Sequence, residues 1–421
     1  MKVLWFSLSP CGSMRRTNST KFTQTWMTTL EDGIKGQRDI DLSVAYYCNA
    51  SSYEPPFDYE GVHYYPIINR DGGLLDKIKE RFESIESQDS VLIKRALEVV
   101  NKVKPDIIHV HGTESNFGLL VDHVKDIPIV ISLQGIISPI VERYYAGIPK
   151  NVVKSCDTIG DYVHQINETK IFDSYKYAAH REQHILHGAK YVLGRTEWDH
   201  QIVSMMAPQA KYYVVNEIIR EEFLNNSWGK SFFGNPFCIV STLSNGIYKG
   251  YELILKSAEI LKQNAPFDFE WKVIGCDESY KYVKASIKMT GLKPSDVNVR
   301  FWGRKMADEM VQLMKDADLY VQTSHIENSP NALCEALCLG MPCLASNVGG
   351  TATMMLDGTV GELYPAGDPY ALSSRIIKLH QDYNRYVEIA RSARDISIKR
   401  NSSESVVERL TQVYQDILNC K

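Results

Sequence analysis

Two glutamates, Glu327 and Glu335, are separated by seven residues in the segment SHIENSPNALCEALCLGMPCLASNVGG (residues 324–350). The first precedes an apolar stretch that has helical character, and the second lies inside it. A carboxylate that is buried without a partner costs free energy, so each side chain should face water or bind a ligand. Carboxylates accept hydrogen bonds from hydroxyl groups. For Glu335 taken alone, a solvated helix face is the better explanation, so the surrounding residues must decide between the two interpretations.

The helix that carries Glu335 is expected to begin at Ser329 as N-cap, with Pro330 in the first turn, and to end at Gly340. Its first turn would offer free backbone N–H groups and the positive end of the helix dipole to an anion. Leu333 begins an apolar stripe at helical spacing, which places Glu335 on a different side of the helix.

A lysine and several glycines follow other segments that have the composition of strands. Lys249 follows residues 237–243, Gly303 ends residues 297–303 with Arg304 after it, and Gly349 and Gly350 follow residues 342–348. Taken singly, the lysine is more typical of a surface and the glycines of a turn. An amine beside a helix N-terminus suits phosphate oxygens, and carboxylates suit sugar hydroxyls. Together these residues predict a site for a nucleotide diphosphate that carries a sugar.

The elements that must position these residues alternate between strand and helix in both halves of the chain. This alternation, with strands that are apolar throughout, predicts parallel sheets that are covered on both faces. The fold class is therefore α/β, with two doubly wound Rossmann-like domains. The expected strands are 3–8, 41–47, 62–67, 106–111, 127–133, 189–194, 237–243, 271–275, 297–303, 318–324 and 342–348, and the expected helices include 76–103, 250–263, 279–291, 307–317 and 403–418.

The domain break is expected within residues 212–237, where strand and turn signals mix with Asn, Gly and Pro. The N-terminal domain would then comprise residues 1–215 and the C-terminal domain residues 216–399. The last helix, in about 400–421, would cross back to the first domain. Ligands of open α/β sheets bind outside the carboxyl ends of the strands, so the predicted site is the cleft between the domains.

Composition excludes several classes of protein. The chain of 421 residues has a formal net charge of −4, which argues against a general nucleic-acid binder. No apolar run approaches the ~20 residues of a transmembrane helix, and the N-terminus is expected to be a first strand rather than a signal peptide. Nine cysteines without zinc-type spacing predict reduced thiols, no metal site and a cytoplasmic location.

Residues 317–350, followed by DGTVGELYPAGDPYAL (357–372), resemble the signature region of the retaining nucleotide-sugar glycosyltransferases of family four (group 1), which have the GT-B fold. The strand, loop glutamate, seven residues, helical glutamate, Gly-Pro turn and Gly-Gly pair occur in the family's order and spacing. Weaker similarity covers PDIIHVHG (105–112), VISLQG (130–135), GRTEWD (194–199) and YKGYELILKSAEIL (248–261).

The resemblance implies a role for each matched position. Glu327 would contact hydroxyls of the donor sugar, Glu335 would hold the ribose hydroxyls, and Lys249 would neutralise the diphosphate. The catalytic set would be Glu327, Lys249 and His111. The residues expected to bind the donor together with Glu335 are Asn328, Ser329, Asn331, Ala332, Leu333, Ser244, Gly303, Arg304, Gly12, Ser13 and Gln134.

Within the N-terminal, acceptor-binding domain, the resemblance implies that the loop at Gly12 and Ser13 closes over the donor. His111 and Gln134 would line the acceptor side of the cleft. Gln134 stands where the family often has a histidine, and a glutamine donates a hydrogen bond but does not titrate. His111 follows an apolar strand, so a structural role fits it as well as a functional one.

A second departure from the family is Ser244, which stands where the family usually has an arginine five residues before the lysine. A serine does not supply the bidentate positive charge of a guanidinium. Either another cation takes its place, with Arg304 or Lys305 as candidates, or the diphosphate is held less tightly. This position also favours a non-catalytic regulatory partner of another transferase as an alternative function.

The expected reaction is transfer of a sugar from a UDP- or GDP-linked donor to a hydroxyl of a saccharide or lipid-linked saccharide, with retention of configuration. The resemblance implies front-face attack, in which the leaving phosphate takes the acceptor proton, and suggests bacterial surface polysaccharide or glycolipid synthesis. No cofactor or metal is expected. An epimerase or phosphorylase of the same fold is the alternative enzyme. Residues 140–190, rich in Tyr, His and Lys, could shape the acceptor pocket, contact an anionic membrane at its inner face, or form solvated helices.

Overall fold

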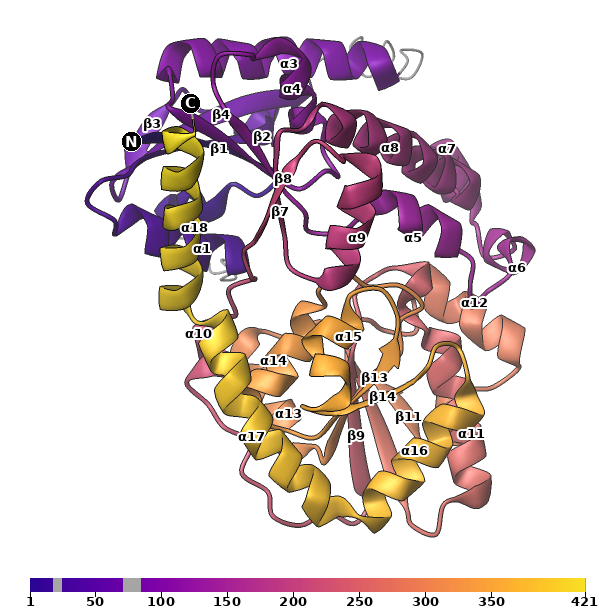
Figure 1. Cartoon of the computed structure of the whole chain (residues 1–421). Helices are drawn as coiled ribbons and strands as arrows, with labels where there is room; N and C mark the ends of the chain where they lie inside the picture. The colour runs from indigo at the N-terminus through magenta and orange to yellow at the C-terminus, as the bar shows by residue number, and fades with distance from the viewer. Residues whose placement is uncertain (18–24, 71–84, 421) are drawn as a thin grey trace.

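The structure is a computed structural model that describes residues 1–17, 25–70 and 85–420 (Figure 1). It contains two α/β domains, each built on one sheet, which face each other across a cleft. The predicted helix over residues 76–103 is described only as α3 (Ile85–Val103), and residues 76–84 lie outside the described part of the chain. The two-domain α/β fold predicted from the alternation of strands and helices is confirmed.

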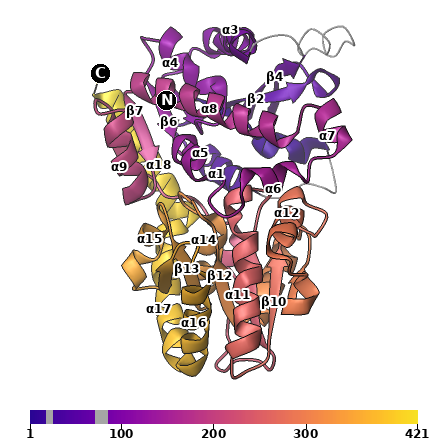
Figure 2. The same ribbon diagram turned by 90° about the vertical axis from the view of Figure 1, so that its right-hand side faces the viewer.

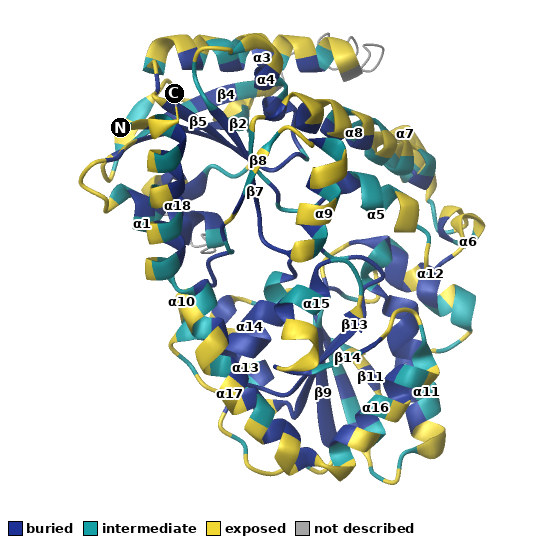
Figure 3. Cartoon of the chain, in the orientation of Figure 1, coloured by how far each residue is buried: buried dark blue, intermediate teal, exposed yellow. Residues whose placement is uncertain are grey.

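The N-terminal sheet has eight strands in the order β3-β4-β2-β1-β5-β6-β7-β8. All neighbouring strands are parallel except the edge pair β3–β4. Its central strands are buried from end to end because helices cover both faces, as the dark blue ribbons in Figure 3 show. The strands are β1 (Lys2–Ser7), β2 (Asp41–Asn49), β3 (Phe57–Tyr59), β4 (Val62–Arg70), β5 (Ile107–His111), β6 (Ile129–Ser132), β7 (Tyr191–Gly194) and β8 (Lys211–Val214).

The C-terminal sheet has six parallel strands in the order β11-β10-β9-β12-β13-β14. The chain passes from β9 to β10 on one side and later returns to β12 on the other side. This reversal places a crevice at the carboxyl ends of β9 and β12, where open α/β sheets bind their ligands. The strands are β9 (Phe237–Thr242), β10 (Phe269–Ile274), β11 (Val299–Phe301), β12 (Leu319–Gln322), β13 (Cys343–Asn347) and β14 (Glu362–Pro365).

Helices of the two domains surround these sheets (Figures 1 and 2). In the N-terminal domain they are α1 (Trp26–Lys35), α3, α4 (Leu120–His123), α5 (Ile137–Arg143), α6 (Lys150–Lys154), α7 (Ile159–Val163), α8 (Glu168–Gly188) and α9 (Glu197–Met206). After α10 (Glu221–Leu224) in the linker, the remaining helices are α11 (Tyr251–Asn264), α12 (Lys281–Thr290), α13 (Ala307–Asp316), α14 (Asn331–Leu339), α15 (Thr351–Met354), α16 (Pro369–Gln381), α17 (Tyr383–Asn401) and α18 (Ser403–Asn419).

The last helix, α18, crosses back to the N-terminal domain, as the sequence predicted (yellow in Figure 1). Its apolar side joins the core between the N-terminal sheet and α1, and Tyr414 and Val413 are fully buried there. The indole N–H of Trp5 in β1 donates a hydrogen bond to the hydroxyl of Tyr414 at 3.0 Å. The N-terminal core is therefore completed by residues from the other end of the chain.

A second connection between the domains is formed by the segment after α5. Lys281 of α12 lies 2.8 Å from a carboxylate oxygen of Asp157 and 3.1 Å from one of Glu168. The Tyr144 hydroxyl lies 3.2 Å from that of Tyr282, and Tyr144 is buried in the core of the C-terminal domain. The sequence left three roles open for residues 140–190: shaping the acceptor pocket, contacting a membrane, or forming solvated helices. In the structure, this part of the segment holds the two domains together.

Lys281→Met is expected to lower the free energy of unfolding by about 3 kcal/mol or more, because it leaves two buried carboxylates without their cation. Both carboxylate side chains are at most 1% exposed. Urea unfolding at neutral pH measures the change. Lys284→Met, an exposed position on the same helix, is the matched control. Equal midpoints for the two variants would show that the pair at Lys281 does not hold the interface.

Candidate functional site

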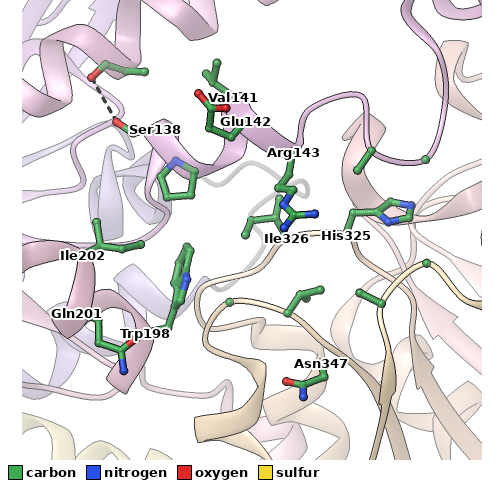
Figure 4. A pocket seen from close by; sticks show the side chains of 18 of the residues that line it. Ser138, Val141, Glu142, Arg143, Trp198, Gln201, Ile202, His325, Ile326 and Asn347 are labelled. Atoms are coloured by element: carbon green, nitrogen blue, oxygen red, sulfur yellow. Dashed lines mark hydrogen bonds between the residues drawn. The ribbon is translucent and has the colours of Figure 1, made fainter.

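Residues of both domains line two neighbouring cavities in the cleft. Cavity A has a volume of about 610 Å³ and lies over the carboxyl ends of β9 and β12. Cavity B has a volume of about 1240 Å³ and lies between α5, α8 and α9 on one side and the loops after β12 and β13 on the other (Figure 4). The candidate residues that line cavity A are Gln134, Ser244, Lys249, Arg304, Glu327, Ser329, Asn331, Ala332 and Glu335.

A partition of hydrogen-bonded loops separates the two cavities. The Thr196 hydroxyl donates to Asn328 Oδ1 at 2.9 Å, and Asn328 Nδ2 donates to the backbone carbonyl of Gln134 at 3.4 Å. Asn328 therefore joins the two domains and does not line cavity A. Consecutive residues of its loop face opposite ways, with Ile326 lining cavity B and Glu327 lining cavity A.

Gly349 packs directly against this partition. Its φ of +47° is a left-handed conformation that favours glycine, and a Cβ added there would lie 1.9 Å from the carbonyl oxygen of Glu327. The protein's own loop lies against the glycine, and the N–H of Gly350 donates to Glu327 O at 3.0 Å.

Lys249 and Glu327 lie together at the edge of cavity A. The Lys249 ammonium donates to Glu327 Oε1 at 2.6 Å, and the Ser324 hydroxyl donates to the same oxygen at 2.7 Å. Both charged side chains are largely buried, with 15% and 13% exposed. The 3₁₀ turn Ile247–Lys249 after β9 and the loop after β12 therefore bring together two groups that are 78 residues apart in the chain.

The helix α14 begins at Asn331, and Pro330 occupies the position before it. The predicted N-cap at Ser329 was wrong, since Pro330 has extended backbone angles and the Ser329 hydroxyl turns toward the sulfur of Met354. The N–H of Leu333 donates to Pro330 O at 3.0 Å and is not free. Among the described residues, the N–H groups of Asn331 and Ala332 have no acceptor and lie at the wall of cavity A.

Glu335 meets Arg220 in cavity A. Arg220 Nε and Nη2 donate to Glu335 Oε1 at 2.9 and 2.6 Å. Burial raises the pKa of Glu335, and the nearby charge of Arg220 offsets part of that rise. Arg220 was missed from the sequence because it lies in the linker, where its partner 115 residues away cannot be recognised from local pattern.

Other cations surround the position of Ser244. Arg304 lines cavity A, is exposed, and forms no ion pair within the described part of the chain. Lys305 instead lies 3.5 Å from Glu309, outside the cavity wall. Arg195 also lines cavity A, 3.8 Å from the buried Glu217, and neither residue of this pair was predicted. Burial alone would raise the pKa of Glu217, but the charges of Arg195 and Arg400 outweigh it and lower that pKa.

His111 is buried at the end of β5 and does not line cavity A. Its ring stacks on His109 at a centroid distance of 3.8 Å, and its two ring nitrogens have no hydrogen-bond partner among the described residues. Burial, together with the neighbouring His109 and Arg195, lowers its pKa well below the ordinary value, so the ring is neutral. It borders a narrow space that adjoins cavity A through Trp26 and Arg195.

Like Asn328 and Leu333, three further predicted binding residues lie away from the walls of cavity A. The N–H of Gly12 donates to Glu31 Oε2 at 3.1 Å, and the Ser13 hydroxyl donates to Pro10 O at 2.6 Å. This loop is held by the N-terminal domain itself, because Glu31 occupies the space beside Gly12. Gly303 lies behind the cavity wall, where its carbonyl accepts a hydrogen bond from the N–H of Gly275 at 2.8 Å.

The family model described as "Glycosyl transferases group 1" matches residues 226–396, which include cavity A's residues from the C-terminal domain after the linker. The amylovoran biosynthesis glycosyltransferase AmsK of Erwinia amylovora is 27% identical over 205 residues, which is 47% of this chain and 49% of AmsK. The chain thus spans about half the length of that relative. The uncharacterised glycosyltransferase MJ1178 of Methanocaldococcus jannaschii is 22% identical over 92% of this chain and 93% of its own length.

Solved structures show the same fold over the whole chain. Sucrose-phosphate synthase from Thermosynechococcus elongatus superposes with a TM-score of 0.69 at 14% identity and covers 100% of both chains. Anabaena HepE, solved in complex with UDP-glucose, gives a TM-score of 0.59 at 17% identity, covering 99% of this chain and 100% of HepE. The arrangement of the two domains is therefore the GT-B fold.

Arg220→Met is expected to destabilise the protein by about 3 kcal/mol at pH 8, because Glu335 loses its cation. The folded-state pKa of Glu335, already raised by burial, then rises further above the unfolded value of about 4.3. A carboxyl group whose pKa is higher in the folded than in the unfolded protein lowers the free energy of unfolding as pH rises above the unfolded pKa, because the unfolded protein ionises more readily. Urea unfolding should therefore show a smaller deficit at pH 5 than at pH 8. Arg304→Met is the control, and a deficit that is independent of pH would contradict the pairing.

Proposed function

We propose that the chain is a group 1 glycosyltransferase, the family whose model matches residues 226–396, and that it transfers a sugar from a nucleotide diphosphate to an acceptor hydroxyl with retention of configuration. One observation carries the proposal. The Lys249 ammonium, the Glu327 carboxylate and the unpartnered N–H groups of Asn331 and Ala332 converge on cavity A. These groups match the phosphate and hydroxyl groups of a nucleotide sugar.

We assign the parts of the donor to different ends of cavity A. Glu335 and Arg220 would hold the ribose, and Lys249 with the start of α14 would hold the diphosphate. Glu327 would then accept hydrogen bonds from the sugar. Arg304 takes the place of the arginine that Ser244 does not supply, since it faces the same cavity and forms no ion pair in the described chain. A UDP- or GDP-linked sugar fits this set, and HepE binds UDP-glucose on the same fold.

The difficult event in this reaction is departure of the diphosphate while positive charge builds on the sugar ring. Lys249 and the N–H groups of α14 are fixed in place before the reaction, so they would stabilise the leaving group without reorganisation. The acceptor hydroxyl would attack from the same face and lose its proton to the leaving phosphate. No carboxylate nucleophile and no metal or cofactor is part of this proposal. His111, neutral and next to cavity A, would border the acceptor rather than transfer a proton.

Lys249→Ala and Glu327→Ala are each expected to lower kcat by ~100-fold or more, the loss typical of one electrostatic contact to the transition state. Release of nucleoside diphosphate from a panel of UDP- and GDP-sugars, with saccharide acceptors, measures this. Lys293→Ala, exposed in the same domain, is the control. Near wild-type turnover of both variants would refute the assignment.

Two other experimental outcomes would favour a different function for this chain. Conversion of the donor without any acceptor, followed by NMR, would identify an epimerase of the same fold. Stabilisation by a nucleotide sugar without turnover on any acceptor would identify a regulatory partner, which is the alternative that Ser244 favours. Thermal unfolding with each nucleotide sugar tests donor binding independently of turnover, since a ligand that binds the native state raises its stability.

We propose a saccharide or lipid-linked saccharide as the acceptor, in bacterial surface polysaccharide or glycolipid synthesis. The name of AmsK, which assigns it to amylovoran biosynthesis, supports this class of pathway. The acceptor would enter beside Thr25, Trp26 and Gln134, which line cavity A from the N-terminal domain. No described helix is both long and apolar enough to span a bilayer.

A peripheral contact with the inner membrane face is supported by an apolar patch at α7. Its side chains are Ile159, Tyr162, Val163 and Ile166, which are 86%, 57%, 55% and 53% exposed. Exposed Lys154 lies close by in sequence and suits anionic headgroups. Apolar side chains that enter the headgroup region, with lysines around them, are typical of proteins that lie on a membrane. We propose that a lipid-linked acceptor is met at this patch.

Replacing Ile159 and Val163 together by aspartate is expected to abolish co-sedimentation with vesicles of anionic phospholipid at low salt. The aspartates remove apolar contact area and add like charge to the surface. Phe232→Asp, which changes an equally exposed side chain of the C-terminal domain, should co-sediment as the wild type does. Co-sedimentation of the double variant at the wild-type level would refute the membrane contact.

A further inference from the structure

The helix α9 has apolar side chains on two sides. Val203 is buried against the N-terminal domain, as expected for a helix that covers a sheet. On another side, Trp198 and Ile202 line cavity B beside Gln201 (Figure 4). Met205, three residues after Ile202, also lines the cavity. Met205 is 79% exposed. Trp198 and Ile202 also pack partly against the N-terminal core, and their remaining surface borders cavity B.

The remaining wall of cavity B contains both apolar and polar side chains. Ser138, Glu142 and Arg143 of α5 face Asn347 at the end of β13 across the cavity (Figure 4). Within the described chain, Arg143 forms no ion pair and the Asn347 side chain forms no hydrogen bond. An indole ring presents a flat apolar surface, and amide, hydroxyl and guanidinium groups around it offer donors and acceptors. This combination suits a ring that has an apolar face and a rim of hydroxyl groups.

The floor of cavity B contains a buried acid–histidine pair. Glu252 Oε1 lies 2.6 Å from His325 Nε2, and Gly147 allows the N-terminal domain to close over the pair, since a Cβ there would lie 2.0 Å from the same carboxylate oxygen. Glu252 Oε2 is buried and has no hydrogen-bond partner among the described residues. His325 lies two residues before Glu327, on the other side of the partition.

The charges of cavity B are close to balance. Its lining lysines and arginine are Arg143, Lys176 and Lys256, and its lining acids are Glu142 and Glu252. Lys176 is paired with Asp173 at 2.7 Å, and Glu252 with His325. This balance suits neutral hydroxyl groups better than the multiple negative charges of a nucleotide. The cavity also exceeds the 300–1,000 Å³ that is typical of sites for one small molecule.

We propose that cavity B is a second carbohydrate-binding site, separate from cavity A, which holds sugar units of a saccharide acceptor or product away from the end that reacts. Trp198 stacks on a sugar ring, and Gln201, Arg143 and Asn347 bind its hydroxyl groups. The class of ligand rests on the proposed transferase function. The site itself rests on the sides of Trp198, Ile202 and Met205 that line cavity B and on the polar side chains that face them across the cavity.

Binding of the purified chain to an array of immobilised bacterial oligosaccharides tests the site without any turnover. The wild type is expected to bind a set of glycans, and Trp198→Ala and Gln201→Ala should each weaken that binding, the first by about tenfold or more. Ser204→Ala, on the same helix but outside the cavity lining, should bind like the wild type. Gln201 is exposed, so its variant keeps the test valid if removal of Trp198 impairs folding.

Absence of glycan binding by the wild type, or equal binding by all three variants, would overturn the proposal. Thermal stabilisation by UDP-glucose and by GDP-mannose, measured on the same proteins, reports on cavity A alone. Loss of glycan binding with unchanged donor stabilisation supports a separate site. Donor stabilisation without glycan binding would refute the glycan site in cavity B and leave the proposed transfer reaction standing. Glycan binding without donor stabilisation would support the site in cavity B and contradict the proposed transfer reaction.

Discussion

The close packing of two glycines against one loop determines the geometry of the whole site. A Cβ on Gly349 would lie 1.9 Å from Glu327 O, and a Cβ on Gly350 would lie 2.1 Å from Asn328 O. Any larger residue would push this loop away from the start of α15. Glu327 would then leave Lys249, Asn328 would leave Thr196, and the start of α14 would move with them. Because Gly349 and Gly350 have no side chains, the loop can pack closely against them, and this contact sets the positions of Glu327 and Asn328.

Cavity A concentrates opposite charges in a protein whose formal net charge is only −4. Glu327 faces Lys249, Glu335 faces Arg220, and Glu217 faces Arg195. All three carboxylates are at least partly removed from water, where an unpaired charge is costly and a paired one is held in a fixed geometry. The site is therefore rigid because its acids and bases restrain one another, and this restraint is what electrostatic catalysis requires.

The sequence predicted what depends on local pattern. The parallel strands, the helix end at Gly340, with its left-handed φ of 77°, and the return of α18 to the first domain follow from periodicity, glycine and apolar spacing. The short edge strands β3, β8 and β14 carry too few residues to show a pattern, and all three were missed. Arg220 was not recognised because only the fold brings it to Glu335. Gly12 was misplaced for the same reason, since Glu31, 19 residues later, decides what the glycine contacts.

The contacts of Lys281 have a consequence for how the molecule admits a substrate. The chain crosses between the domains at the linker and again at α17–α18, which run along one side of the molecule, while the Lys281 contacts lie toward the opposite side (Figure 1). Three attachments that do not share one axis cannot all act as hinges. Rigid rotation of one domain about the other would have to break a buried ion pair. A ligand would therefore reach cavity A either past the loops that border the cleft or after the contacts of Lys281 break.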